Sequence, residues 1–265
     1  MNNISMKQDK KIPFDSPDFV TSLAGGLSVL RAFDDNHSTM TLSEVAECTN
    51  MDRAKARRYL LTLHALGYVH KDKRQFKLSP KTLSIGSSYL SSAHHHDIVQ
   101  FYLERVTEKT GESCSFAVLD DDEVVYIARS AAKHRLLSIS LSIGTRLPVA
   151  YTSMGRAILA NLPEDEREDY VDKIELNAYT PFSIIDREQF KNMLSAAHDE
   201  QYVVVDQELD TGLRSLALPV YKSNDELIGA INISTNAMRV SKETLIKEFL
   251  PILRDCAEKI QTYYI

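Results

Sequence analysis

Cysteine is scarce in this chain of 265 residues, and long apolar runs are absent from it. Its three cysteines, Cys48, Cys114 and Cys256, are too widely spaced for a disulfide framework or a zinc site, so a reducing cytoplasm is the expected environment. No run of about 18 apolar residues occurs, and no transmembrane helix is expected. The first 17 residues carry charges without an apolar core behind them, which excludes a secretory signal and favours a mobile tail over residues 1–18.

Positive charge is unevenly distributed along the chain. Hydrophobic residues make up 43% and charged residues 26%, the composition of an ordinary globular protein with one large domain or two unequal ones. The formal net charge is −6, yet residues 52–78 hold eight Lys or Arg against two Asp, a balance of +6. The remainder of the chain therefore carries −12, and the basic segment needs its own explanation.

Three helices are predicted in the first quarter of the chain. Apolar residues recur at helical spacing from Phe19 to Phe33, and a second helix is expected over 41–50 with Thr41 or Ser43 as its cap. After a break, a third helix runs from about Asp52 to Leu66 with its basic residues in the first two turns. Two β-like runs, YVHK and QFKL, then flank the charged turn DKR. This order predicts a winged helix-turn-helix domain over 19–79.

The basic residues fit the DNA-facing surface of such a domain. A recognition helix enters the major groove by its N-terminal half, and Lys and Arg there and in the wing attract phosphates. An isolated basic helix is often only a solvated face, but the helix before it, the wing after it and the acidic remainder favour DNA binding. The predicted DNA-binding residues are Thr41, Ser43, Arg53, Lys55, Arg57, Arg58, Tyr59, Lys71, Lys73 and Arg74.

Several segments resemble the IclR family of transcriptional regulators. GGLSVLRAF (25–33), LSEVAECTNMDRAKARRYLLTLHALGYV (42–69) and FKLSPKTLSIGSSYL (76–90) resemble its DNA-binding half. RLPVAYTSMGRAILA (146–160), YVVVDQELDTGLRSLALPV (202–220) and GAINIS (229–234) resemble its effector-binding half. The resemblance covers roughly residues 20–260. The runs SSYLSSAH (87–94) and ARRYLLTL are most similar to the branch that senses protocatechuate or 4-hydroxybenzoate and controls genes of aromatic acid breakdown.

The second half of the chain reads as an α+β domain. A linker helix is expected over 80–95, and a further helix over 96–112 with Phe101 on its inner side. Residues 96–265 then form the second domain, whose layout the resemblance implies is GAF-like. Strands are predicted over 113–120, 124–130, 213–221 and 227–234, and helices over 153–160, 163–172, 186–200 and 242–262.

The resemblance implies effector contacts at the start of the 153–160 helix and on the two late strands. In this sequence those positions are Ser153, Met154, Ser215, Asn232 and Ser234. For an organic acid the natural partner is a guanidinium with its paired donors, and Arg129 is the first candidate with Arg146 second. Ser and Asn at strand ends are also common structural hydrogen-bonders, and Arg129 could equally be a surface residue.

Metal binding and catalysis are not expected. The three consecutive imidazoles of AHHHD (93–97) point in different directions on a helix and cannot chelate one ion, so this run is a solvated linker. Cys114 with His134 as base is a conceivable nucleophile, but a buried structural cysteine is far commoner and no oxyanion motif accompanies it. No cofactor is predicted, and the chain is not expected to be an enzyme.

The predicted function is therefore a cytoplasmic, DNA-binding regulator that responds to a small organic acid, an aromatic one if the branch resemblance holds. Two half-sites in double-stranded operator DNA would require a homodimer or a dimer of dimers, without a membrane partner. Three alternatives stay open: an IclR-type regulator with a non-aromatic effector, a DNA-binding protein whose second domain only oligomerises, and an enzyme with a nucleic-acid-binding appendage. The sequence leaves open whether the protein activates or represses.

Overall fold

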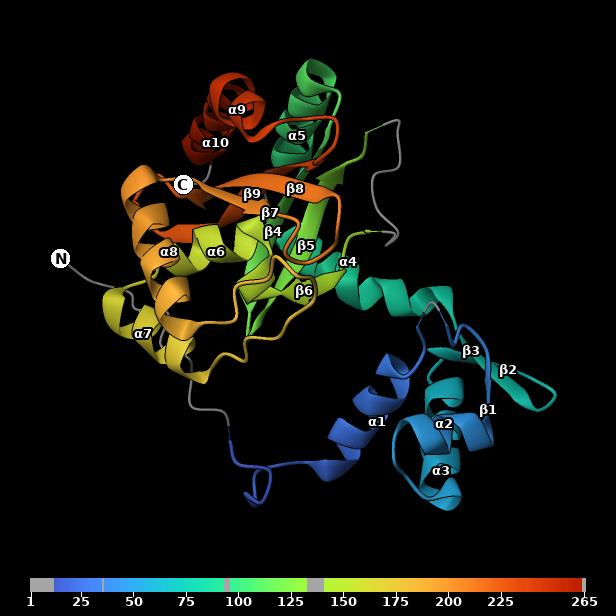
Figure 1. The fold of residues 1–265 in the computed structure, drawn as a ribbon. Coiled ribbons are helices and arrows are strands. Elements are labelled where there is room, and N and C mark those ends of the chain that lie inside the picture. The colour runs from blue at the N-terminus through green and yellow to red at the C-terminus, as the bar shows by residue number, and fades with distance from the viewer. Residues whose placement is uncertain (1–11, 35, 93–95, 133–140, 264–265) are drawn as a thin grey trace. The chain divides into compact units, whose positions relative to one another are not determined.

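The computed structural model describes residues 12–34, 36–92, 96–132 and 141–263 (Figure 1). The chain divides into two compact units, Met1–Tyr89 and Leu90–Ile265, and the division falls inside helix α4 (Leu83–Ser92). Each unit has its own hydrophobic core. Most of the predicted mobile tail, the imidazoles His94 and His95, and His134 lie outside the described residues.

The first unit holds three helices and a small antiparallel sheet of strand order β1-β3-β2. The predicted winged helix-turn-helix elements are present, and the structure adds the short strand β1 beside the wing. The bounds are α1 Thr21–Arg31, β1 Met40–Thr41, α2 Leu42–Cys48, α3 Arg53–Ala65, β2 Val69–Asp72, β3 Gln75–Leu78, a 3-10 turn Pro80–Thr82, and α4.

Local chemistry fixes the turn between α2 and α3. Thr41 caps α2 in a capping box, since its side chain accepts from the Glu44 N–H while the Glu44 carboxylate accepts from the Thr41 N–H. Asn50, at φ 50°, makes the left-handed turn that Asn tolerates better than most residues. The Asp52 carboxylate then caps α3 by accepting from Lys55 N at 2.8 Å. The basic first turns of α3 are thereby held on the surface of the unit.

The second unit is a six-stranded antiparallel sheet of order β6-β5-β4-β9-β8-β7 with helices on both faces. Its strands are β4 Ser113–Asp120, β5 Glu123–Ser130, β6 Arg146–Pro148, β7 Val203–Asp206, β8 Leu213–Tyr221 and β9 Leu227–Asn236. Its helices are α5 His96–Thr110, a 3-10 turn Val149–Tyr151, α6 Ser153–Ala160, α7 Glu164–Lys173, α8 Arg187–Glu200, α9 Lys242–Thr244, a π-helical turn Leu245–Phe249, and α10 Leu250–Tyr263.

Strand alternation divides the core of this unit into two layers. Ala117, Tyr126 and Ala230 face α6 and α8, whereas Cys114 and Phe116 face α5 and α10. The helix predicted over 96–112 is present with nearly the expected bounds. The prediction that Phe101 lies on its inner side is wrong, because the residue is exposed and the buried side of α5 consists of Val99, Leu103 and Val106. Two edge strands, β6 and β7, were not predicted as strands.

Helix α6 begins at a point of very close backbone packing. A Cβ added at Gly155 would lie 2.2 Å from the Val149 carbonyl oxygen, so only glycine fits there. The Thr152 hydroxyl caps the helix by accepting from Gly155 N at 3.1 Å. This contact fixes the first turn of α6 against the 3-10 turn before it.

No helix in the described part of the chain is long and apolar enough to cross a membrane. In the same part, no group of three His, Cys, Asp or Glu residues gathers as metal ligands.

Candidate nucleic-acid interface and ligand pocket

The N-terminal half of α3 presents a cluster of unpaired cations. Arg53, Lys55, Arg57 and Arg58 are all exposed, while the opposite side of the helix is buried through Ala56, Leu60 and Leu63. Among the described residues none of these four side chains makes a hydrogen bond or ion pair. Their charge therefore remains available to a polyanion.

The wing adds a second set of cations. Strands β2 and β3 are joined by the two-residue turn Lys73-Arg74, with Lys73 at φ 54° in the left-handed region. Lys71, Lys73 and Arg74 are exposed, and Lys77 projects from β3. A basic hairpin beside a basic helix start is the arrangement with which a winged helix contacts the DNA backbone.

Two predicted DNA contacts serve packing or capping in the structure. The Tyr59 ring lies against α1 so closely that a Cβ on Gly25 would come within 2.6 Å of it, and it joins the core of the first unit. Tyr59 is therefore a packing residue, because it lies next to the side of α3 on which Leu60 and Leu63 are buried. Thr41 is committed to the α2 cap, whereas Ser43 is exposed at the helix start.

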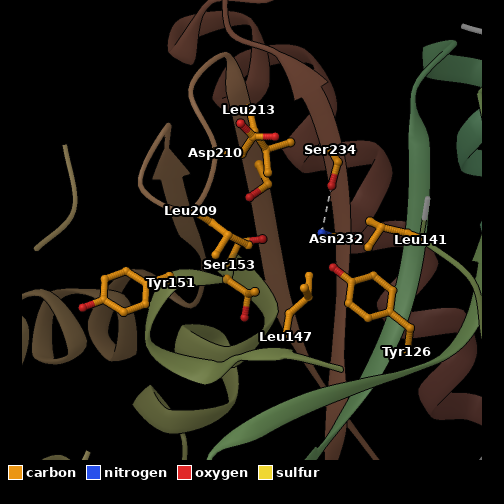
Figure 2. A pocket seen from close by; sticks show the side chains of 12 residues that line it. Tyr126, Leu141, Leu147, Tyr151, Ser153, Leu209, Asp210, Leu213, Asn232 and Ser234 are labelled. Atoms are coloured by element: carbon orange, nitrogen blue, oxygen red, sulfur yellow. Dashed lines mark hydrogen bonds between the residues drawn. The ribbon is translucent and has the colours of Figure 1, made fainter. Parts of the chain in front are cut away.

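A pocket lies in the second unit between the sheet, the start of α6 and the β7–β8 loop (Figure 2). Four of the predicted effector residues, Ser153, Ser215, Asn232 and Ser234, come together in its lining. The full lining comprises Tyr126, Leu141, Leu147, Tyr151, Thr152, Ser153, Leu209, Asp210, Leu213, Ser215, Asn232 and Ser234. Leucine side chains make up much of the pocket wall, and hydroxyl and amide groups provide its hydrogen-bonding positions.

Two buried polar atoms in this lining lack a partner within the described residues: Ser153 Oγ and Asn232 Oδ1. Both side chains are almost fully buried, and the Asn232 amide nitrogen donates to Ser234 Oγ at 3.1 Å (Figure 2). A buried polar group without a hydrogen bond costs about 1–3 kcal/mol. Such groups are rare in native cores and indicate a place where a ligand supplies the missing partner.

Arg129 lies on the same face of the sheet as these polar groups. It pairs with Ser115 across β5 and β4, and Ser115 in turn pairs with Asn232 across β4 and β9. Its guanidinium Nη1 donates to Ser115 Oγ at 3.0 Å, and within the described chain no carboxylate pairs with it. Burial lowers the pKa of Arg129, because desolvation disfavours the charged form. The side chain is a half-buried cation beside the pocket without a counter-charge.

The Tyr126 hydroxyl points toward Asn232 in Figure 2. Burial raises the pKa of Tyr126 to about 12, so the phenol stays protonated near neutral pH and can donate a hydrogen bond. Sequence reasoning missed Tyr126. Simple alternation would put positions 126 and 129 on opposite faces, but the register shifts between Phe116 and Ala117 and returns both to one face.

Arg129 is not itself part of the lining, and two further predicted effector residues also lie outside it. The Arg146 guanidinium is paired with Asp120 and with Glu123, a surface ion-pair cluster at the end of β5 and β6. Met154 is fully buried in the core between α6 and the sheet, because it points to the other side of the helix start from Ser153. Neither side chain is placed to contact a ligand in this pocket.

The pocket is nearly closed in this structure. Its cavity volume is about 20 Å³, the space of roughly one water molecule. The described residues hold no feature of a nucleophile there, since burial raises the pKa of Cys114 well above its ordinary value and the thiol lies on the opposite face of the sheet. The lining combines apolar side chains with hydrogen-bonding groups, the composition of a site for a small polar molecule.

Comparisons with known proteins match both units. Residues 22–73 match a family model described as the IclR helix-turn-helix domain, and residues 87–262 match the bacterial transcriptional regulator IclR C-terminal domain. The Pca regulon regulatory protein of Pseudomonas putida is 40% identical over 237 residues, 89% of this chain and 81% of that protein. The p-hydroxybenzoate hydroxylase transcriptional activator of Acinetobacter baylyi is 35% identical over 248 residues, 92% of each chain.

A solved structure resembles the second unit. It is the inducer-binding domain of a double mutant of the PobR transcription factor from Acinetobacter in complex with 3-hydroxybenzoic acid. The two chains are 30% identical with a TM-score of 0.58, over 62% of this chain and 96% of that one. All three relatives regulate transcription.

Proposed function

This chain belongs to the IclR family of bacterial transcriptional regulators, and we propose that it binds operator DNA through α3 and the wing in response to an aromatic acid held in the α6 pocket. It is a DNA-binding regulator, not an enzyme. Because its target is bacterial operator DNA, it acts in the cytoplasm. The proposal for the effector rests on one observation. On the pocket face of the sheet, Arg129 has no carboxylate partner in the described chain, and Ser153 and Asn232 in the leucine-walled pocket each hold one buried polar atom without a partner among the described residues.

The chemistry of these groups fits a hydroxybenzoate. Arg129 supplies paired donors for a carboxylate, and leucines such as Leu147 and Leu213 supply apolar contact for the ring. Ser153 and Asn232 supply hydrogen-bonding groups for a ring hydroxyl. The names of two relatives support the same class, since one activates a p-hydroxybenzoate hydroxylase gene and the other was crystallised with 3-hydroxybenzoic acid.

Occupancy of the pocket regulates DNA binding by linkage. If the effector shifts operator affinity by some factor, operator DNA must shift effector affinity by the same factor. Operator affinity would then be measured with and without the acid, and affinity for the acid would be measured with and without operator DNA.

A thermal-shift screen of the purified protein tests the effector class. Protocatechuate or 4-hydroxybenzoate at about 100 times its dissociation constant adds about 2.7 kcal/mol to native-state stability. For a domain of this size the melting midpoint should rise by about 5 °C or more. Benzoate, pyruvate and glyoxylate serve as controls, because they carry the carboxylate without the ring hydroxyl or without the ring.

The pattern of responses separates the alternatives. A shift with pyruvate or glyoxylate but not with hydroxybenzoates would indicate a non-aromatic effector and contradict the aromatic proposal. A flat response to every acid, together with intact operator binding, would indicate a second domain that only oligomerises.

The same proposal includes a homodimer built on the first unit. A groove along α1 and α3 is lined by Leu23, Leu27 and Leu66 together with Ile85 of α4, and these apolar side chains are exposed. Contiguous exposed apolar groups of this kind mark protein–protein interfaces. Lys55 and Arg58 of α3 also line this groove, so we place the second copy on its α1 and α4 side, which leaves the basic start of α3 to the DNA half-site.

Replacing Leu23 and Leu27 with glutamate should convert the dimer to monomer. The two side chains are 63% and 49% exposed in the single chain, so the fold should survive. Charges buried in a dimer interface are strongly unfavourable, and operator affinity should fall with the loss of the second half-site. Analytical ultracentrifugation reads the mass, and Met238→Glu, at an exposed position in the other unit, is the matched control. A dimer that persists in the double variant would place the interface elsewhere.

A further inference from the structure

A buried ion pair connects helix α6 to the β7–β8 loop. Arg156, one turn after Ser153, is 1% exposed, and its two terminal nitrogens donate to the two Glu208 carboxylate oxygens at 2.6 Å each. The Arg156 Nε donates to the Ala150 carbonyl at 2.6 Å. The Glu208 side chain is 9% exposed. This paired, two-point geometry fixes the orientation of Glu208 as well as its distance from α6.

Glu208 also holds a third segment. The Ile184 N–H donates to Glu208 Oε2 at 3.0 Å, and the Ser183 hydroxyl donates to the Glu208 carbonyl at 2.6 Å. The Thr180 hydroxyl donates to the neighbouring Gln207 carbonyl at 2.7 Å. We name residues 179–185 the strap. A single glutamate therefore joins α6, the β7–β8 loop and the strap.

The residues that follow Glu208 form the pocket wall. Leu209, Asp210 and Leu213 line the pocket, and the loop is closed by Gln207 N donating to the Leu213 carbonyl at 2.7 Å. Gln207 at φ 61° and Gly212 at φ 89° are both left-handed and bracket the wall residues. Residues 209–211 therefore lie between two tight turns, and Leu209 directly follows Glu208 in the chain.

We propose that Glu208, held by Arg156, is a positioning residue of the effector site: it sets where Leu209 and Asp210 stand in the pocket wall and ties that wall to the strap. The inference rests on the proposed effector function. A cavity of about 20 Å³ cannot take an aromatic ring, so binding must displace the wall. Because Glu208 is clamped on α6, the displacement falls on residues 209–213, while the Ile184 hydrogen bond keeps the strap attached to the clamped carboxylate.

The experiment separates positioning from simple stability. Glu208→Gln keeps the shape and loses the charge, which leaves Arg156 as a buried cation and can destabilise the protein. The double variant Arg156→Met with Glu208→Leu replaces the buried pair by apolar groups of similar size, an exchange that is often neutral or stabilising. Calorimetric titration with 4-hydroxybenzoate or protocatechuate measures affinity. Hydrogen exchange of peptides covering 179–185 and 207–213 measures the amide protection of the strap and of the wall, respectively, in the absence of ligand. Glu112→Gln, at a buried carboxylate paired with Arg239 at 2.7 Å outside the pocket lining, is the matched control.

Positioning predicts that the double variant melts at or above the wild-type midpoint yet binds the hydroxybenzoate about tenfold or more weakly, because a site whose supporting groups are lost becomes too loose. It also predicts faster exchange in both peptides. A double variant with wild-type affinity and wild-type exchange would overturn the inference and leave the pair a purely structural contact. If the wild type itself binds no hydroxybenzoate, the proposed effector class fails, and the ligand-free exchange alone decides the role of Glu208.

Discussion

Replacing Arg57 and Arg58 with alanine is expected to weaken operator binding about 100-fold. Both side chains are exposed in the first half of α3 and make no hydrogen bond or ion pair with another described residue, so their removal should leave the fold intact. A lost base contact costs about 1–3 kcal/mol, and two such losses near the lower end of that range, about 2.7 kcal/mol together, give about two orders of magnitude. Fluorescence anisotropy with a labelled operator fragment measures the change.

The salt dependence shows which kind of contact was lost. Each neutralised phosphate contributes about −0.9 to the slope of log affinity against log salt, so losing two phosphate contacts should reduce the slope by about 2. The double variant Lys242→Ala with Lys247→Ala removes the same charge from exposed positions in the other unit and should leave the slope unchanged. Wild-type affinity and slope in the Arg57 and Arg58 variant would mean that α3 is not the recognition helix.

The sequence predicts the first unit well because its signals are local. Helical periodicity, a capping threonine, a left-handed Asn50 and a two-residue basic turn each lie within a few neighbouring positions. The packing of Tyr59 against α1 was missed for the converse reason. Its role depends on a contact with Gly25 of α1, a residue 34 positions earlier that no local pattern identifies.

The pocket was predicted only in part. Ser153, Ser215, Asn232 and Ser234 were named from the family resemblance, whereas Leu209 and Asp210 reach the lining through a loop whose path is set by the ion pair between Glu208 and Arg156. That pair joins positions 52 apart, and its partners carry no sequence pattern that links them.

The sequence ranks Arg129 before Arg146 as the partner of a carboxylate, and the fold places the two in different surroundings. Arg146 ends in a surface ion-pair cluster, since its edge strand β6 places it beside Asp120 and Glu123. Arg129 is turned to the pocket face by the irregularity in the β4–β5 register. Such a bulge changes the parity of a strand by one residue, and strand alternation alone cannot locate it.

Replacing Arg129 with glutamine is expected to weaken binding of the hydroxybenzoate about 100-fold. The guanidinium is the cation that lies beside the polar end of the pocket without a carboxylate partner in the described chain. Hydrogen bonds to charged groups contribute about 1.5–3 kcal/mol, and the paired geometry of a guanidinium on a carboxylate lies near the top of that range. Calorimetric titration of the purified variant measures the loss.

The folded state should tolerate this replacement, which makes the affinity change interpretable. Burial lowers the pKa of Arg129, and the side chain makes no ion pair within the described chain, so the replacement removes one hydrogen bond to Ser115 and no salt bridge. The variant should bind operator with wild-type affinity in the absence of acid and should lose the response to it. Arg146→Gln is the matched control, since it removes an arginine of the same unit that is paired outside the pocket. If Arg146→Gln abolishes binding while Arg129→Gln leaves it intact, the carboxylate does not bind at Arg129. The ligand would then bind at the β6 edge of the sheet.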